Sequence, residues 1–291
     1  MSPDTIGEAL LWTAGHLERA GIEEVRLESR LLVAQALGKS PEYVFSHPER
    51  VLDDAAQERL NQVVARRARH EPMAYITGQR EFWSLPFTVA PSTLIPRPDS
   101  ETLVDAVLNA RPDADGTLRI LDLGTGSGCL LLALLHERRN WTGVGLDRSA
   151  AALEVAAANA QSLELAQVSE FVCHDWAEKP LVELGLGDFD LVIANPPYIA
   201  ESDRQNLAPD VIDFEPLDAL FAGADGLDAF RFIVPQAVAV LVPGGGLFLE
   251  VGYDQSDRVA AILAAHGYDG IGERRDVSGI ARCVFAGIEK Q

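Results

Sequence analysis

The chain has 291 residues, of which 47% are hydrophobic and 23% are charged. This length suits one large domain or two smaller ones, and the composition leaves no room for long disordered tracts. The formal net charge of −20 repels phosphate backbones, so nucleic acid is a disfavoured direct partner. The N-terminal residues lack the pattern of a signal or transit peptide, and no apolar run has the length of a membrane span, so we expect no membrane partner.

The cysteines and the basic residues indicate neither a metal centre nor a binding patch. Cys129, Cys173 and Cys283 are scattered without a C-x-x-C spacing, which supports neither a disulfide framework nor a zinc site. We therefore expect no metal and a reducing, cytoplasmic location. The longest basic cluster, Arg66 to His70, is predicted to be the solvated end of a helix, where cations complement the helix dipole.

The first quarter of the chain carries helical patterns only. Thr5 followed by Glu8 is a capping-box pattern, and Gly38 stands where a second helix would end. Ser40-Pro41 then places an N-cap residue before a proline that suits the first helical turn. These patterns predict an N-terminal helical bundle domain over residues 1–72.

The remaining chain changes periodicity twice. Residues 73–100 hold aromatic residues between prolines, which predicts a short β-hairpin and a connector. From there on, short apolar runs alternate with helical segments, as in βαβ units with a parallel sheet covered on both faces. The expected strands are Leu118–Leu123, Gly143–Leu146, Glu170–Cys173, Asp190–Ala194, Leu247–Val251 and Ala281–Ala286, and the expected helices are 129–138 and 150–160. We predict an α/β fold with a Rossmann-like sheet of seven strands over residues 101–291.

A glycine-rich turn follows the first expected strand and opens a helix. Glycines let the backbone approach a ligand closely, and the helix N-terminus offers free N–H groups with a partial positive charge. The spacing differs from the dinucleotide pattern G-x-G-x-x-G. A plain structural turn is the alternative. The candidate cofactor contacts in this turn are Gly124, Thr125, Gly126, Ser127 and Gly128.

Carboxylates at the ends of the next two strands fit an adenosine cofactor. Asp147 can accept two hydrogen bonds from a ribose diol; its alternative role is to cap the following helix, although Ser149 already suits that position. Asp175 can accept from adenine, and the Trp176 indole can cover the adenine face. Taken alone, a tryptophan after a strand more often serves packing.

The strand that ends at Ala194 runs into Asn195-Pro196-Pro197-Tyr198, a stiff turn rich in hydrogen-bond acceptors. An amide nitrogen is a poor nucleophile because its lone pair is delocalised into the carbonyl. Two oxygens that hold its NH₂ hydrogens would aim the lone pair at a sulfonium methyl and stabilise the charge that develops on nitrogen. The pattern predicts Asn195, Pro196 and Tyr198 as catalytic residues, with Pro197 completing the substrate contact.

With these motifs the chain resembles the HemK/PrmC family of release-factor glutamine methyltransferases along nearly its whole length. The similar segments are Glu71–Gly78, Phe82-Trp83, Leu94–Pro98, Asn195–Tyr198, Phe214-Glu215-Pro216, Asp225–Asp228 and Leu249–Gly252. The family usually has Glu-Thr-Glu where this chain has Asp99-Ser100-Glu101. The carboxylates and the hydroxyl are kept, so we expect the chemistry to be unchanged.

The resemblance implies a class I methyltransferase fold with S-adenosyl-L-methionine as cofactor. It also implies that the glycine turn, Asp147, Trp176 and Asn195 contact the cofactor. The implied partner is a class 1 peptide chain release factor, whose Gly-Gly-Gln glutamine would be held by Asn195 to Tyr198. We further expect a monomer.

Three other functions share part of this pattern. A ribosomal-protein glutamine methyltransferase would use the same chemistry, but Ile95–Pro98 resembles the release-factor branch. An adenine-N6 nucleic-acid methyltransferase needs a similar acceptor turn, and the net charge of −20 disfavours it. A module that binds the cofactor without turnover is disfavoured by the intact acceptors at Asn195 and Pro196.

Overall fold

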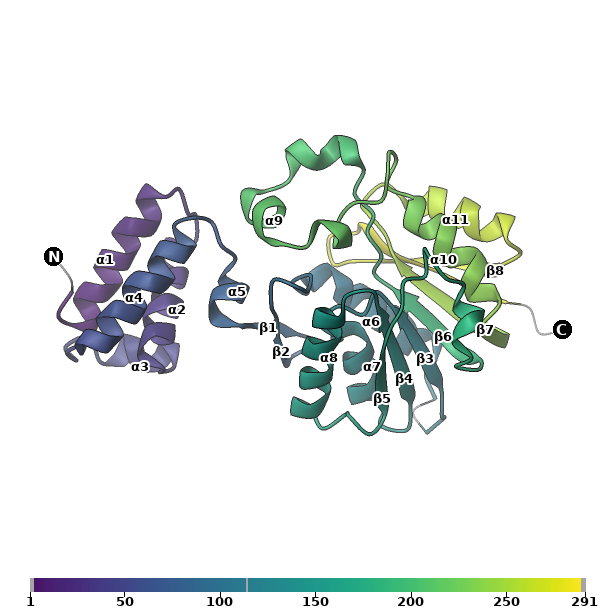
Figure 1. The fold of residues 1–291 in the computed structure, drawn as a ribbon, viewed down its shortest axis with the longest axis horizontal. Coiled ribbons are helices and arrows are strands. Elements are labelled where there is room, and N and C mark those ends of the chain that lie inside the picture. The colour runs from purple at the N-terminus through teal and green to yellow at the C-terminus, as the bar shows by residue number, and fades with distance from the viewer. Residues whose placement is uncertain (1–2, 114, 289–291) are drawn as a thin grey trace. The chain divides into compact units, whose positions relative to one another are not determined.

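The computed structural model describes residues 3–113 and 115–288. Its contacts divide the chain into two compact units, which we describe separately (Figure 1). A helical unit comprises residues 1–79 and 208–214, and an α/β unit comprises residues 80–207 and 215–291. Within the described residues, no helix is both long enough and apolar enough to cross a bilayer.

The helical unit consists of α1 (Ile6–Arg19), α2 (Val25–Leu37), α3 (Pro41–Ser46), α4 (Asp54–Arg67), α5 (Met73–Thr77) and α9 (Pro209–Phe214). The predicted caps explain where the first helices begin and end. The Thr5 hydroxyl accepts from the Glu8 amide at 3.3 Å, whereas the Glu8 carboxylate accepts from Asp4, one residue before the position that a capping box uses. Gly38 ends α2 in the left-handed conformation at φ 61°.

The basic cluster lies at the C-terminal end of α4 as predicted, but the prediction that it is solvated was wrong for Arg67. Arg67 is buried and binds the Glu28 carboxylate through two hydrogen bonds of 2.6 and 3.0 Å. Arg66 binds Glu71 in the same two-point manner. Planar guanidinium groups match carboxylates in this geometry, so these arginines fasten α4 to α2 and to the following loop.

The predicted hairpin consists of β1 (Gln79–Phe82) and β2 (Leu85–Thr88). Its two turn residues, Trp83 and Ser84, both have left-handed backbones, at φ 54° and 58°. This conformation matches the twist of a two-residue hairpin but is costly for non-glycine residues. The Glu101 carboxylate accepts from the Trp83 amide at 2.8 Å, and Glu137 accepts from the Trp83 indole at 2.9 Å. These two carboxylates hold the strained turn in place.

The α/β unit is built on a seven-stranded sheet in the order β5-β4-β3-β6-β7-β9-β8. Its strands are β3 (Arg119–Leu123), β4 (Thr142–Asp147), β5 (Ser169–Cys173), β6 (Phe189–Ala194), β7 (Leu241–Glu250), β8 (Asp269–Arg275) and β9 (Ala281–Gly287). The strands from β5 to β7 are parallel, and β9 runs antiparallel to both β7 and β8. The predicted α/β class is confirmed. The edge strand β8 was not among the expected strands, because its residues are mostly exposed and form no apolar run.

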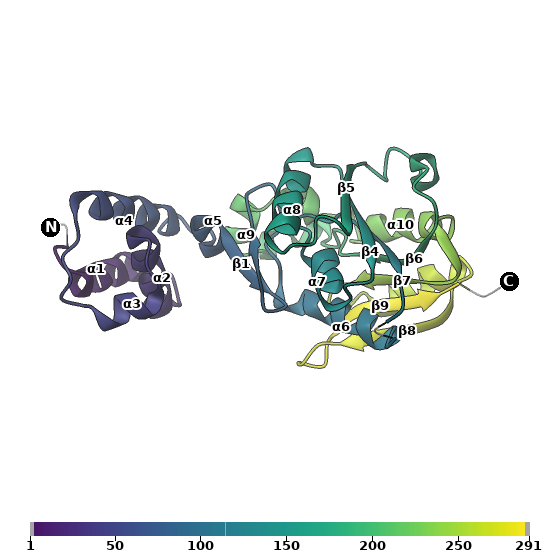
Figure 2. The same cartoon turned by 90° about the horizontal axis from the view of Figure 1, so that it is seen from below.

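Helices cover both faces of this sheet (Figures 1 and 2). One face carries α6 (Glu101–Ala110), α7 (Cys129–Glu137) and α8 (Ala150–Ser162), and the other carries α10 (Asp228–Val238) and α11 (Ser256–Ala265). Short 3-10 segments are η1 (Pro98–Ser100), η2 (Leu181–Leu184), η3 (Glu201–Asn206) and η4 (Leu217–Ala219). Because β4 and β6 flank β3 on opposite sides, the strand order reverses at β3. Ligands bind beyond the carboxyl ends of strands at such a point.

Candidate functional site

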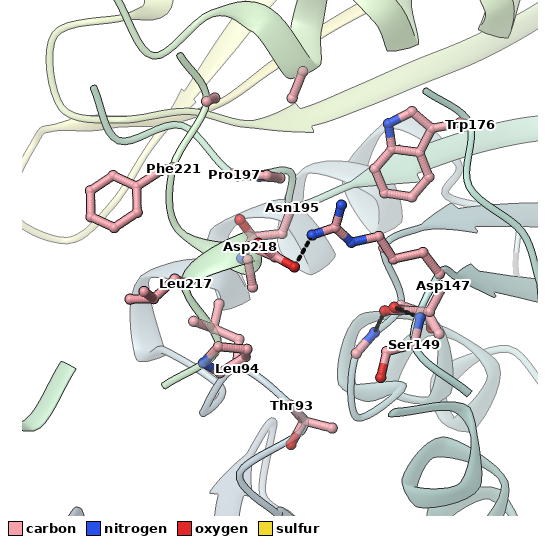
Figure 3. Close-up of a pocket in the computed structure, with 18 of the residues that line it drawn as sticks. Thr93, Leu94, Asp147, Ser149, Trp176, Asn195, Pro197, Leu217, Asp218 and Phe221 are labelled. Atoms are coloured by element: carbon pink, nitrogen blue, oxygen red, sulfur yellow. Dashed lines mark hydrogen bonds and ion pairs between the residues drawn. The ribbon is translucent and has the colours of Figure 1, made fainter. Parts of the chain in front are cut away.

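A cavity of about 700 Å³ lies at the carboxyl ends of the parallel strands (Figure 3). This volume suits a small organic ligand. Residues of every predicted motif line it, namely Gly124, Thr125, Gly126, Ser127, Asp147, Asp175, Trp176, Asn195 and Pro197. The predicted contacts Gly128, Pro196 and Tyr198 are not among its lining residues. The fold therefore gathers most of the predicted site around one cavity, and three of the predicted residues are not part of its lining.

The glycine turn between β3 and α7 is tied to the neighbouring strand. The amides of Gly124 and Thr125 donate to the Leu146 carbonyl at 2.8 and 2.9 Å. Gly124 has φ +76°, and a Cβ there would lie 3.0 Å from the Trp176 ring. The indole thus packs on the bare backbone of the turn, so both the backbone angle and this contact favour glycine.

Asp147, at the end of β4, organises the turn as well as lining the cavity. Its Oδ2 accepts from the Gly126 amide at 3.0 Å, and its Oδ1 accepts from the Ser149 amide at 2.9 Å. Ser149 is the N-cap of α8, as predicted, and accepts from the Ala152 amide. Each carboxylate oxygen can accept more than one hydrogen bond, so Asp147 retains capacity for a ribose diol.

The part of the cavity lining formed by Arg148 and η4 contains an ion pair that the sequence pattern did not reveal. Arg148 forms a salt bridge with Asp218 on η4, drawn as a dashed line in Figure 3. A second nitrogen of Arg148 lies 4.0 Å from Asp175. The guanidinium therefore joins the β4 end of the cavity to η4. A lone exposed arginine carries no periodic signal, so only the fold identifies its partner.

The acceptor turn after β6 presents Asn195 and Pro197 to the cavity (Figure 3). The Asn195 side-chain nitrogen donates to the Ser100 hydroxyl at 3.2 Å, and among the described residues no donor binds the Asn195 Oδ1. Pro196 is buried, and the Tyr198 hydroxyl lies 3.5 Å from the Glu250 carboxylate. The Tyr198 hydroxyl thus contacts a carboxylate of the neighbouring strand β7, and the predicted substrate contact of Tyr198 stays a prediction.

Two buried carboxyl groups lie close to this site. Glu250 is 2% exposed, and burial raises its pKa to about 7 against the opposing effects of Ser100 and Arg282. Asp122 is 1% exposed and accepts from the Thr125 hydroxyl at 2.7 Å. Burial likewise raises the pKa of Asp122 to about 7. Both groups can therefore change charge near neutral pH.

Comparison with known proteins identifies the family. The family model described as the PrmC N-terminal domain matches residues 8–78, and a methyltransferase domain model matches residues 114–250. The release factor glutamine methyltransferase of Rhodospirillum rubrum is 42% identical over 281 residues, which cover 97% of this chain and 84% of that protein. The enzyme of the same name from Coxiella burnetii is 42% identical over 261 residues, covering 90% and 91% of the two chains. This chain belongs to the release factor glutamine methyltransferase family.

Structural comparison agrees with the fold of this family. The solved catalytic domain of hMettl16, in complex with the MAT2A 3′UTR hairpin 6, aligns with a TM-score of 0.57 at 15% identity. The alignment covers 87% of this chain and 91% of that one, and at this identity the likeness concerns the fold alone. The fold is that of class I methyltransferases, whose cofactor is S-adenosylmethionine. The predicted family, fold class and cofactor are confirmed.

The structure also explains family segments to which the sequence analysis assigned no contact. Gln255 donates to the Tyr198 carbonyl at 2.8 Å, and a Cβ on Gly226 would lie only 2.3 Å from that same oxygen. The Asp225–Asp228 segment therefore supports the acceptor turn through a glycine that permits close approach. Asn159 was missed entirely. This buried residue binds both backbone groups of Thr88 and donates to the Ser127 carbonyl at 2.9 Å, joining the hairpin to the glycine turn.

Proposed function

We propose that this protein transfers the methyl group of S-adenosyl-L-methionine to the side-chain amide nitrogen of the glutamine in the Gly-Gly-Gln motif of a class 1 peptide chain release factor. The observation that carries this proposal is the placement of Asn195. Its Oδ1 accepts no hydrogen bond from the part of the chain that the structure describes, and the side chain lines the same cavity as the glycine turn. The names of the curated relatives supply the choice of protein substrate.

The residues around the cavity fit the cofactor. Asp147 retains acceptor capacity for the ribose hydroxyls, and Trp176 with Asp175 would hold the adenine. The turn from Gly124 to Gly128 brings backbone N–H groups and the N-terminus of α7 to the anionic end of the ligand. When bound, the cofactor supplies an electrophilic sulfonium methyl group.

The acceptor turn would prepare the substrate amide for attack. The Asn195 Oδ1, together with a backbone carbonyl of the turn, would accept the two NH₂ hydrogens of the substrate glutamine. These contacts hold the amide plane so that the nitrogen lone pair faces the methyl position. They also stabilise the positive charge that develops on nitrogen during transfer, which is where preorganised dipoles lower a barrier most. No side-chain base is needed before the transfer, because the methylated nitrogen is acidic enough to lose its proton to water.

The proposal also covers the roles of the three chain regions, the oligomeric state and the cellular location. We assign substrate recognition to the helical region 1–72, connection to residues 73–100 and catalysis to residues 101–291. We also propose that the enzyme acts as a cytoplasmic monomer on a protein rather than on a nucleic acid. The net charge of −20 supports the last point, because a direct nucleic-acid partner would be repelled.

The test is methylation of a purified release factor with isotopically labelled cofactor, followed by mass spectrometry of the Gly-Gly-Gln peptide. One label on the glutamine side chain is the expected result. A release factor with asparagine in place of that glutamine is the matched negative substrate. Ribosomal protein and single-stranded DNA serve as competing substrates, and label on either of them with none on the release factor would overturn the proposal.

A further inference from the structure

The acceptor turn is least constrained where it ends. Asn195 and Pro196 each precede a proline, which biases both residues toward an extended backbone. Pro197 precedes Tyr198, so its ψ angle is not restricted in this way. The two prolines also have no backbone N–H with which the turn could hold itself. The end of the turn, at Pro197 and Tyr198, therefore depends on donors from outside the motif.

The side chain of Gln255 supplies such a donor. Gln255 is 4% exposed, and its amide nitrogen donates to the Tyr198 carbonyl at 2.8 Å and to the Gly226 carbonyl at 3.2 Å. Its amide oxygen accepts from the Gly252 amide at 2.9 Å. Both ends of this buried amide are thus bonded, and three separate segments of the chain meet at one side chain.

The chemistry of these partners fixes the orientation of the Gln255 amide. A reversed amide would place its oxygen against two carbonyl oxygens and its NH₂ group against an N–H donor. Glycines leave room for the contacts. A Cβ on Gly226 would lie 2.8 Å from the Gln255 nitrogen, and a Cβ on Gly252 would lie 2.9 Å from the Gln255 oxygen. The surrounding chain is therefore shaped around this one amide.

The start of α11 does not explain this arrangement. Gln255 occupies the N-cap position of α11, where a short polar side chain usually accepts a hydrogen bond from an amide of the first helical turn. The Gln255 side chain makes no such bond. Its polar atoms serve the acceptor turn and the two glycine segments instead of the helix.

We propose that Gln255 is a positioning residue that fixes the end of the acceptor turn and so aims the acceptors of this turn at the substrate nitrogen. The inference rests on the proposed function and adds a residue outside the motif on which the catalytic geometry depends. Without the donor from Gln255, the last peptide of the turn can rotate, and Pro197, which lines the cavity (Figure 3), moves with it. Misplaced acceptors would hold the substrate amide away from the methyl group.

The effect belongs to turnover and not to cofactor binding. Most predicted cofactor contacts, in the glycine turn, at Asp147 and at Trp176, follow other strands of the sheet than the acceptor turn does. The chain beyond the turn is also held independently of Gln255, because the Ile199 amide donates to the Leu220 carbonyl at 2.9 Å. Loss of Gln255 should therefore displace the turn while the surrounding sheet stays folded.

The first experiment measures kcat and cofactor Kd for Gln255→Met and Gln255→Glu in the full-length enzyme, with a release factor as substrate. Methionine keeps the length of the side chain without its hydrogen bonds. Glutamate keeps the shape and the acceptor for Gly252, but an ionised carboxylate has no hydrogen to give to the two carbonyl groups. Each variant should lower kcat roughly 10- to 100-fold, with the cofactor Kd within about twofold of the parent value.

Gln236→Met is the matched control. Gln236 on α10 also makes three hydrogen bonds: its nitrogen donates to the Trp176 and Phe232 carbonyls at 2.9 and 3.3 Å, and its oxygen accepts from the Leu181 amide at 2.9 Å. The control therefore removes as many bonds without a contact to the acceptor turn. Both methionine variants should melt at a lower temperature than the parent, but kcat of Gln236→Met at saturating cofactor should stay within about twofold of the parent value.

The second experiment displaces the Gln255 side chain without removing it. Gly252 does not have a positive φ, so alanine is compatible with its backbone. The added Cβ would lie 2.9 Å from the Gln255 oxygen, at the flexible end of that side chain. Gly252→Ala should therefore give a kcat between those of the parent and Gln255→Met. This variant tests the inference even if the changes at Gln255 prevent folding.

The outcomes separate this inference from the proposed function. If the parent enzyme leaves the release factor unmethylated, the proposed function fails, and the role of Gln255 fails with it. If the parent methylates the release factor and Gln255→Met keeps the kcat of Gln236→Met, only the role of Gln255 is overturned. Parent-rate turnover by Gln255→Glu or Gly252→Ala would overturn it as well, and so would a loss of cofactor affinity in the Gln255 variants at unchanged kcat.

Discussion

Arg97 and Glu215 form an ion pair between residues that are 118 positions apart in the chain. The Glu215 side chain is 1% exposed, and its second oxygen accepts from the Ile95 amide at 3.2 Å. This single carboxylate therefore joins the Leu94–Pro98 connector to the segment around Pro216, and both segments line the cavity. Two family motifs that are remote in sequence thus form one wall of the site.

Removal of Arg97 should destabilise the fold. Arg97→Ala leaves the Glu215 carboxylate buried with one backbone donor, which should cost about 1–3 kcal/mol of unfolding free energy. The value belongs at the lower end, because the Arg97 side chain is 35% exposed and partly screened by water. Chemical denaturation measures it. Arg204→Ala is the control, because it breaks an exposed ion pair with Glu201 and should lower the free energy of unfolding by less than about 1 kcal/mol. Equal losses of this free energy in the two variants would contradict the bridging role of Glu215.

Asp147 should contribute to cofactor affinity. Asp147→Ala removes the proposed acceptor of the ribose hydroxyls and the contacts to Gly126 and Ser149, so binding should weaken by roughly 1–3 kcal/mol. Asp147→Asn keeps one acceptor oxygen and should lose less. Titration calorimetry with S-adenosylmethionine gives both values. Unchanged affinity in Asp147→Ala would remove this residue from the cofactor site.

Asn195 should matter for turnover and little for stability. Asn195→Ala should lower kcat by on the order of 10²–10³-fold, the effect of removing one preorganised hydrogen-bonding group. Asn195→Asp should retain partial activity, because a carboxylate accepts the NH₂ hydrogens but pairs with the positive sulfonium in the ground state. Single-turnover methylation and thermal melting test this. Turnover at the parent rate in Asn195→Ala, with an unchanged melting temperature, would disprove the acceptor-turn mechanism.

Glu250 should make stability depend on pH. Its pKa of about 7 in the folded protein exceeds the ordinary value of 4.5, so the folded state keeps a proton that the unfolded chain releases. The stabilising contribution of this bound proton to the free energy of unfolding is fully present below about pH 4.5 and is lost as the pH rises through about 7. Glu250→Gln cannot ionise and should flatten this part of the profile, leaving the slope due to Asp122. The measurement is the free energy of unfolding of both proteins by chemical denaturation between about pH 5 and 8. Identical slopes of this free energy against pH in parent and variant would contradict the prediction.

Gly226 should be intolerant of a side chain. A Cβ there would lie 2.3 Å from the Tyr198 carbonyl oxygen, and the residue also has φ +74°. A left-handed backbone alone costs a non-glycine residue about 1–2 kcal/mol. Gly226→Ala should therefore lower the free energy of unfolding by more than this amount. Gly267→Ala is the matched control, because Gly267 has φ +77° with no atom within 4 Å of the added Cβ. Denaturation curves for the two variants should differ, and equal losses would exclude a steric role at Tyr198.

Local patterns in the sequence predicted much of this protein. Alternation of apolar runs with helical segments predicted the α/β sheet, because a strand buried on both faces needs a continuous apolar run. The glycine turn, Asp147 and Asn195 each follow such a run. Since the carboxyl ends of parallel strands gather at one edge, their proximity followed from chain order alone. The resemblance to a known family supplied the substrate, which no pattern of periodicity contains.

Only the tertiary structure decided which side chains meet. The edge strand β8 lacks an apolar run, so its membership depends on pairing with β9. Tyr198 belongs to the acceptor motif, and its hydroxyl lies 3.5 Å from the buried carboxylate of Glu250, which is 52 positions away in the chain. Likewise, the bond from Asn195 to Ser100 spans 95 positions. Contacts between residues so far apart in the chain depend on how helices and strands pack. A buried polar group must find a hydrogen-bond partner, and a local pattern of residues does not identify which residue packing places beside it.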